Sequence, residues 1–123
     1  MYNDSVLERE GKKRKGIKKM KGTEKQIKWA EDIKTNAINT LEANIEKTAT
    51  EPLFKADNQA YRILLAVTKN ALSKIEDAGT LIDRRIYFDP RSLIKTASTW
   101  ADNIRTGRFT VEQIAEQNRV TEW

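Results

Sequence analysis

The chain has 123 residues, enough for one domain with a single core, and it contains neither Cys nor His. Their absence excludes disulfides, thiolate or imidazole catalysis and an ordinary structural zinc site. The net charge of +5 is unevenly spread, because residues 11–21 carry seven cations and no acid, residues 1–10 have a net charge of −2, and residues 22–123 are neutral.

The first 22 residues hold few apolar side chains, and Gly11, Gly16 and Gly22 interrupt their run of like charges. Charge repulsion and the lack of apolar surface predict a flexible, disordered basic arm over residues 1–22, followed by a helical domain over residues 23–123. No apolar run approaches the roughly 20 residues that span a bilayer, and no apolar segment follows the basic run as in a secretory signal. We therefore expect no membrane partner and a cytoplasmic location.

The helical domain opens with a capping box, Thr23-Glu24-Lys25-Gln26. Apolar residues then recur at spacings of three and four, which predicts an amphipathic helix that fades near residues 47–49. Trp29, four residues before Ile33, widens the apolar stripe. The stripe itself comprises Ile27, Ala30, Ile33, Ala37, Ile38, Leu41 and Ile45.

A second helix is predicted in the most apolar stretch of the chain, and we expect it to be the most buried. Its start is open, because either Thr50-Glu51-Pro52 or a cap at Asp57 is compatible with the sequence. Gly79 is expected to end it. The stripe is formed by Tyr61, Leu64, Leu65, Thr68, Leu72 and Ile75, with Leu64, Leu65 and Leu72 expected at the centre of the core.

Three further helix starts follow. Thr80 begins a short helix that runs to about Ile86, and Asp89-Pro90 combines a capping Asp with Pro at the first helical position. The next stripe ends before Gly107 and comprises Leu93, Ile94, Ala97, Trp100, Ala101 and Ile104.

A last helix starts at a second capping box, formed by Thr110 and Gln113, with Phe109 packing on Ile114. No stretch alternates with a period of two. The sequence therefore predicts an all-α fold, a small bundle of four to five helices preceded by the basic arm.

The last segment, residues 107–121, also resembles the first half of a helix-turn-helix. Arg119 stands where the turn usually carries Gly, and only two residues follow Thr121. We therefore expect no recognition helix here and interpret the segment as a terminal helix that closes the bundle.

Two segments have similar sequences, WAEDIKT beginning at Trp29 and WADNIRT beginning at Trp100. A capping box precedes the first segment but follows the second, whereas a tandem duplication would keep the same order. Similar packing requirements therefore explain the similarity better than duplication does. We therefore expect both tryptophans to be mostly buried in a seam between helices.

The arm is the clearest candidate site. Lysines that neutralise phosphates release counterions, so this cluster predicts salt-sensitive binding to an RNA or DNA backbone, alone or in a nucleoprotein complex, without sequence preference. The alternative is a tail that only improves solubility. The candidate nucleic-acid-binding residues are Lys12, Lys13, Arg14, Lys15, Lys18, Lys19 and Lys21.

A second basic cluster surrounds Tyr87 and Phe88 and comprises Arg84, Arg85, Arg91 and Lys95. Cations mixed with aromatic rings can stack on bases or grip a protein surface. The alternative is that the two rings fill the core and the arginines pair with Asp83 and Asp89.

No grouping of residues indicates catalysis. Helix caps and salt bridges account for Asp83, Asp89 and Asp102, the serines lack a base, and no glycine-rich phosphate loop is present. We expect no enzyme activity, no cofactor and no metal ion.

Residues 22–34, GTEKQIKWAEDIK, resemble a TEKQIxWAExIK-type segment that recurs in small uncharacterised bacterial proteins, many of them on phages and other mobile elements. In that group a Trp-rich segment often follows near the C-terminus, and residues 99–105 are similar to it. The resemblance implies a phage or mobile-element accessory protein. Such proteins often bind and block a host factor, including defence nucleases.

Two hypotheses follow. One is a small non-enzymatic nucleic-acid- or ribonucleoprotein-binding accessory protein that acts through its arm. The other is an anti-defence inhibitor whose helical body, or body plus arm, binds and blocks a host protein such as a CRISPR nuclease complex.

Overall fold

The structure is a computed structural model that describes residues 20–123. Within this range it contains five α-helices, two 3-10 helices and no strand, which confirms the predicted all-α bundle. The elements are α1 (Glu24–Thr48), η2 (Pro52–Phe54), α2 (Lys55–Ser73), α3 (Ala78–Asp83), η3 (Arg85–Phe88), α4 (Pro90–Arg105) and α5 (Val111–Gln117).

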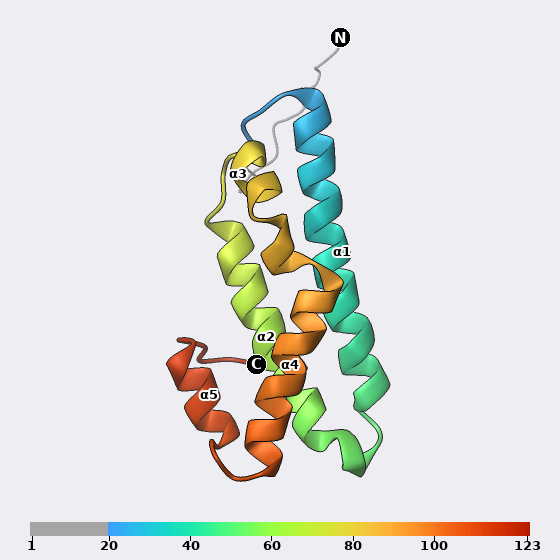
Figure 1. Cartoon of the computed structure of the whole chain (residues 1–123), viewed down its shortest axis with the longest axis vertical. Coiled ribbons are helices and arrows are strands. Elements are labelled where there is room, and N and C mark those ends of the chain that lie inside the picture. Colours follow the sequence, from blue (N-terminus) through green and yellow to red (C-terminus); the bar gives the residue numbers. More distant parts are fainter. Residues whose placement is uncertain (1–19) are drawn as a thin grey trace.

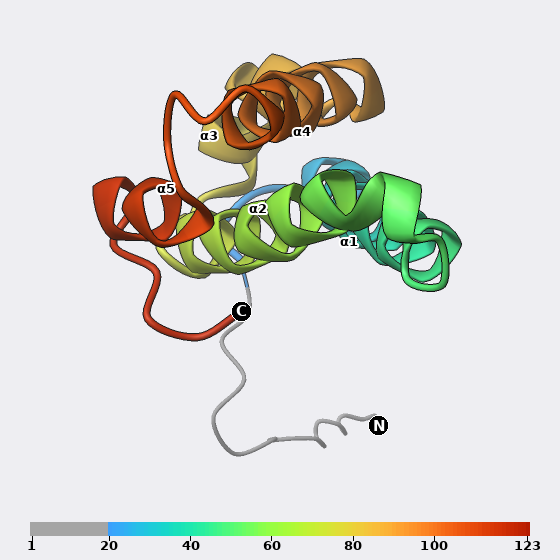
Figure 2. The same cartoon turned by 90° about the horizontal axis from the view of Figure 1, so that it is seen from below.

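The helices form two layers. Helices α1 and α2 run antiparallel in one layer, as Figure 1 shows. Helices α3 and α4 lie over them in a second layer, and α5 lies beside α2 (Figure 2). Small side chains at the contacts let the helix backbones approach closely. These are Ala30, Ala37, Ala60, Ala97 and Ala101, each at most 1% exposed.

Helix α1 begins and ends where the sequence predicted. The Thr23 hydroxyl accepts from the Gln26 N–H at 3.1 Å, and the Gln26 side chain accepts from the Thr23 N–H at 3.0 Å. This reciprocal pair satisfies two N–H groups that the first helical turn leaves without partners. The helix ends at Thr48, inside the predicted range.

Helix α2 starts through η2, which leads directly from Pro52 to Lys55. Asp57 does not cap the helix, because it lies inside the first turn of α2. Its carboxylate instead accepts from Arg105 at 2.7 Å, which links α2 to the last turn of α4. Helix α2 contains seven buried residues, more than any other described helix, as predicted, whereas the short α3 buries a larger share of its own residues, three of six.

The prediction that Gly79 ends the second helix is wrong. Helix α2 stops earlier, at Ser73, and the Asp77 side chain accepts from the Thr80 N–H at 3.2 Å as the cap of α3. Gly79 therefore lies in the first turn of α3. A capping Asp two residues before Gly outweighs the tendency of Gly to terminate helices.

The core has two neighbouring parts. The larger lies between α1, α2, α3 and α4, and the smaller joins α2 to α5. Leu64 and Leu72 are buried as predicted, whereas Leu65 is only partly buried and that part of the prediction is wrong. The largest fully buried side chains are Leu41, Ile63, Leu81 and Ile114.

The buried phenol of Tyr61 makes the free energy of unfolding depend on pH in the alkaline range. Burial, and secondarily the charge of Asp57, raises the pKa of this phenol above the ordinary 10.0. Below pH 10 the phenol is neutral in the folded and unfolded chain, so its contribution is constant. Above pH 10 the unfolded chain ionises first, so the free energy of unfolding falls as pH rises. We expect the free energy of unfolding to fall less steeply with pH in Tyr61→Phe than in the unchanged protein, measured by chemical unfolding between pH 9 and about 11. Equal slopes for the two proteins would contradict a raised pKa of Tyr61.

Helix α5 has the predicted capping box at Thr110 and Gln113, and Phe109 packs against the part of the core that contains Ile114. Its C-terminus turns back sharply. The Val120 N–H donates to the Ala115 carbonyl at 2.8 Å and the Arg119 N–H donates to the Glu116 carbonyl at 3.0 Å, as in a Schellman motif. The left-handed position of this motif, usually Gly, is Arg119 with φ of 59°.

Replacing Arg119 with glycine should therefore stabilise the protein. A non-glycine residue in the left-handed region costs about 1–2 kcal/mol, partly offset by the greater entropy of glycine in the unfolded chain. We expect a net gain of about 0.5–1 kcal/mol in the free energy of unfolding, measured by urea denaturation. A loss of similar size would contradict the turn geometry.

Candidate functional site

The basic arm joins the body at a defined place. Lys12, Lys13, Arg14, Lys15, Lys18 and Lys19 lie outside the described residues, whereas the structure describes Lys21 and shows it exposed. The Lys21 N–H donates to the Glu76 carbonyl and the Ala78 N–H donates to the Lys21 carbonyl, each at 2.8 Å. Met20, at 6% exposed, belongs to the core. The last residues of the predicted arm are thus attached to the body beside the start of α3.

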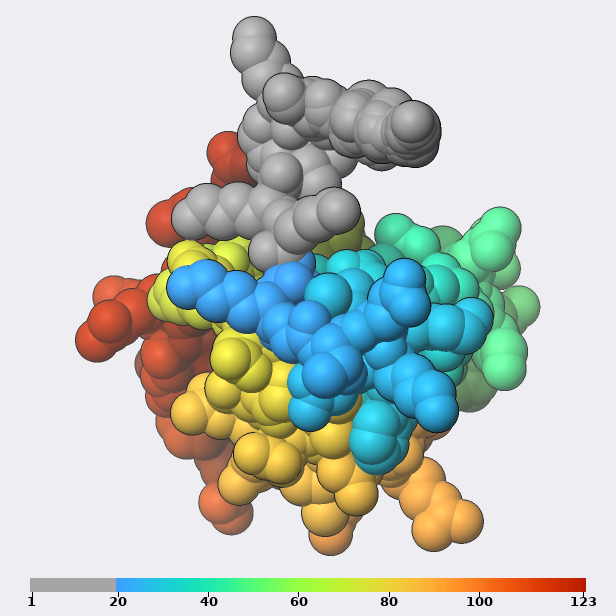
Figure 3. All heavy atoms as spheres, turned by 90° about the horizontal axis from the view of Figure 1, so that it is seen from above, coloured from blue at the N-terminus to red at the C-terminus, as the bar shows by residue number. Residues whose placement is uncertain are grey.

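Gly22 makes the turn from this attachment into α1. Its φ of 143° is disfavoured for side-chain-bearing residues, and a Cβ here would lie 3.1 Å from the Ala78 Cβ. Figure 3 looks down on this end of the molecule, where the start of α1, in blue, lies beside α3, in yellow. Lys21 and Gly22 therefore lie next to both helices.

The second basic cluster lies on the surface, as all four cations are exposed. Arg85 donates to the Ile82 carbonyl at 2.8 Å and lies over the Trp29 ring, 5.2 Å from its centre. Within residues 20–123, the side chains of the other three cations, Arg84, Arg91 and Lys95, have no hydrogen bond or ion pair.

The alternative reading of this cluster is wrong in two of its three parts. Phe88 does fill the core, but Tyr87 is 71% exposed. The arginines do not pair with Asp83 or Asp89 within residues 20–123; the Asp89 carboxylate instead caps α4, accepting from the Arg91 backbone N–H at 3.2 Å. A 3-10 helix of four residues offers one narrow inward face, so only one of its rings can be buried.

Of the two tryptophans predicted to be mostly buried, Trp29 differs from expectation and Trp100 does not. Trp29 is 48% exposed, so its predicted burial is wrong, whereas Trp100 is partly buried against both parts of the core. Trp29 directly precedes Ala30, which is fully buried, and successive helical residues are about 100° apart around the axis. Trp29 therefore lies at the edge of the buried stripe and faces η3 through Arg85.

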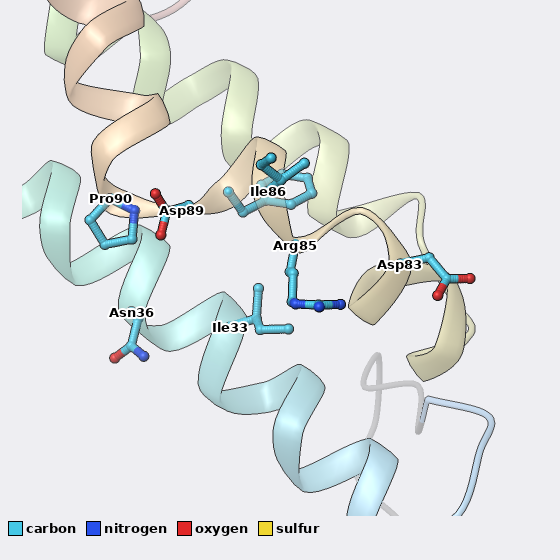
Figure 4. A pocket seen from close by; sticks show the side chains of 8 residues that line it. Ile33, Asn36, Asp83, Arg85, Ile86, Asp89 and Pro90 are labelled. Carbon is cyan, nitrogen blue, oxygen red and sulfur yellow. The ribbon is translucent and has the colours of Figure 1, made fainter.

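A cavity of about 480 Å³ opens between α1 and the segment from η3 to the start of α4. Figure 4 shows the Arg85 side chain beside Ile33 of α1, with its guanidinium extending toward α3. Asp89 and Pro90 lie at one end of this region and Asp83 at the other. The lining residues are Ile33, Asn36, Asp83, Arg85, Ile86, Phe88, Asp89 and Pro90.

This region is suited to binding. Ile86, which lines the cavity, is 66% exposed, and the side chains of Trp29 and Tyr87 are also exposed. Within residues 20–123, the nearby cations Arg84 and Arg91 have no side-chain partner. Sequence reasoning identified the cations but missed Ile86 and Trp29 as surface residues. The available signal was the crowding of Ile86, Tyr87 and Phe88 between two helix caps, which leaves too few turns to bury all three.

Within residues 20–123, no group of three or more acidic side chains is placed to hold a metal ion. No helix in this range is long and apolar enough to cross a bilayer. No protein-family model matches the chain, and searches of curated proteins and of solved structures likewise find no match.

Proposed function

We propose that this chain is a small, non-enzymatic, nucleic-acid- or ribonucleoprotein-binding accessory protein of the cytoplasm. In this proposal, the cations of residues 12–21 contact phosphates. The observation that carries it is the distribution of charge, with seven cations in this short segment and a net charge of zero over residues 22–123. Phosphate neutralisation releases counterions and supplies affinity that does not depend on sequence.

The attachment of Lys21 to the body supports this role. Two backbone hydrogen bonds hold Lys21 beside α3, so the cationic segment would begin from a fixed point. Gly11 and Gly16 add backbone freedom, which would help the segment to follow a phosphate chain. It has no aromatic residue, so it would distinguish nucleic acids by charge and shape rather than by base stacking.

The first experiment is a deletion. Because Met20 is buried, the deletion should end at residue 19, so that the body keeps its core. We expect the shortened protein to keep its helical circular dichroism spectrum and to lose most of its affinity for labelled duplex DNA and single-stranded RNA, measured by fluorescence anisotropy. Equal nucleic-acid binding by the full and the shortened protein would mean that the arm only improves solubility.

A second function is favoured by the exposed apolar side chains of the body. Trp29, Ile86 and Tyr87 lie on the surface of an electrically neutral helical bundle, where protein partners commonly bind. Together with the resemblance to proteins of phages and mobile elements, this favours an inhibitor of a host protein such as a CRISPR nuclease complex.

The second function is tested in bacteria whose CRISPR nuclease destroys a targeted plasmid. Expression of the protein in these bacteria should restore the survival of that plasmid. Undiminished plasmid loss would rule this function out for the nuclease tested.

A further inference from the structure

The contact between α1 and η3 creates a surface with a distinctive composition. We call it the α1–η3 surface and define it by Trp29, Ile33, Arg85, Ile86 and Tyr87. Arg85 connects its two sides, because its guanidinium lies over the Trp29 ring and also lines the cavity with Ile33 and Ile86. Protein interfaces concentrate their binding energy in Trp, Tyr and Arg side chains.

We propose that the α1–η3 surface binds a protein segment that places one large apolar side chain in the cavity and acidic residues against the surrounding cations. This inference rests on the second function above, protein binding by the helical body, and is independent of the basic arm. It adds the position of the binding site and the chemistry of the partner.

The cavity favours an apolar side chain. Four of its eight lining residues are apolar, and its volume of about 480 Å³ is within the range of pockets that hold small ligands. The four are Ile33, Ile86, Phe88 and Pro90. Ile86 is 66% exposed, so covering it would remove apolar surface from water. An aromatic or large aliphatic side chain fits this site.

The charge around the cavity favours an acidic partner. Residues 83–95 contain four cations and two acids, and Asp89 already caps α4. Within the described chain, Arg84, Arg91 and Lys95 have no side-chain partner, so an incoming carboxylate would not have to displace one. Complementary charges at the rim of an interface guide association and select the partner.

A nucleic acid fits this surface less well than a protein does. The lining residues Ile33, Ile86 and Phe88 offer an apolar site, which suits an apolar side chain better than a phosphate or a ribose. Arg85 already covers part of the Trp29 ring, which reduces the area open to a stacked base. The observations therefore favour a protein segment over a single strand.

The test uses the full chain and short fluorescent peptides. The probe peptide carries one tryptophan flanked by glutamates; one control replaces the glutamates with lysines and another replaces the tryptophan with alanine. We expect the acidic tryptophan peptide to bind, and both controls to bind at least roughly tenfold more weakly, in anisotropy titrations.

Variants locate the binding. Ile86→Asp and Trp29→Ala should each weaken peptide binding roughly tenfold or more. Leu53→Asp is the matched control, since Leu53 is 78% exposed and lies in η2, away from the cavity lining. It should leave binding unchanged. Circular dichroism checks that each variant remains folded, and Tyr87→Ala provides a milder second variant if Ile86→Asp does not fold.

Three outcomes would overturn the proposal. One is the absence of binding by the acidic peptide at about 1 mM. Another is equal weakening by Leu53→Asp and Ile86→Asp. The third is displacement of the peptide by a single-stranded oligonucleotide whose own binding is lost in the same variants, which would make the surface a nucleic-acid site.

Deletion of residues 1–19 separates this proposal from binding by the arm, because it should leave peptide binding unchanged. The plasmid assay tests the inhibitor function by itself. Peptide binding without plasmid protection would uphold the surface and exclude that nuclease as its target.

Discussion

Replacing Leu41 with alanine is expected to lower the free energy of unfolding by about 2–5 kcal/mol, the usual cost of truncating a buried leucine. Leu41 is fully buried in α1, within the larger part of the core. The loss combines the apolar contacts of the removed atoms with the cavity they leave, which surrounding side chains fill incompletely. For a marginally stable domain this is a large fraction of the total.

Two other leucines calibrate the measurement. Leu53→Ala removes the same atoms from a side chain that is 78% exposed, so urea denaturation should show a change within about 0.5 kcal/mol. Leu65→Ala should fall between the two, because Leu65 is only partly buried. Similar losses for Leu41→Ala and Leu53→Ala would contradict the arrangement of α1 in the core.

The second large effect is expected on binding. Changing all seven cations of residues 12–21 to glutamine should weaken binding to duplex DNA roughly a hundredfold or more at low salt, because no phosphate contact would release counterions. Glutamine keeps the chain length and leaves the backbone hydrogen bonds of Lys21 in place. The variant therefore tests the effect of the arm's charge on binding without removing the arm itself.

The matched control removes the same charge from the body. It changes seven lysines of residues 22–123 to glutamine and leaves the second basic cluster intact. If net charge alone governs binding, both variants weaken it equally; if the arm is the site, the control keeps most of its affinity. The control positions are Lys25, Lys28, Lys34, Lys47, Lys55, Lys69 and Lys74.

Local signals in the sequence predicted the helix starts well. Thr23, Asp89 and Thr110 each begin a helix as expected, because a cap requires only a side chain and backbone N–H groups two or three residues away. The prediction failed at Gly79, where two local signals competed and the cap at Asp77 prevailed.

Burial at the edge of a helix stripe could not be predicted in the same way. Trp29 and Leu65 both adjoin fully or nearly fully buried residues, and whether such a position is covered depends on where the next layer lies. The packing of α3 and η3 against α1 decides this for Trp29, whose ring lies under Arg85 of η3. That packing is a long-range property, which periodicity does not encode.

In the candidate sites, too, local features could be predicted from the sequence and features that depend on long-range packing could not. The sequence located the cations of the second cluster and their exposure follows from their charge. The cavity beside Arg85 arises from residues such as Ile33 and Pro90, which are far apart in the chain and meet only in the folded body. No spacing rule in the sequence could have joined them.

The salt dependence of DNA binding tests the proposed function most directly. Each neutralised phosphate contributes a slope of about 0.9 to the plot of log affinity against log salt for duplex DNA, and about 0.7 for single strands. Seven contacts would give slopes of about 6 and 5 in magnitude for the full chain. The arm variant with glutamine at all seven positions should bind weakly with a much shallower slope, while the body control keeps the steep one. The same affinity and slope for the full chain and the arm variant would contradict the proposal that residues 12–21 bind nucleic acid.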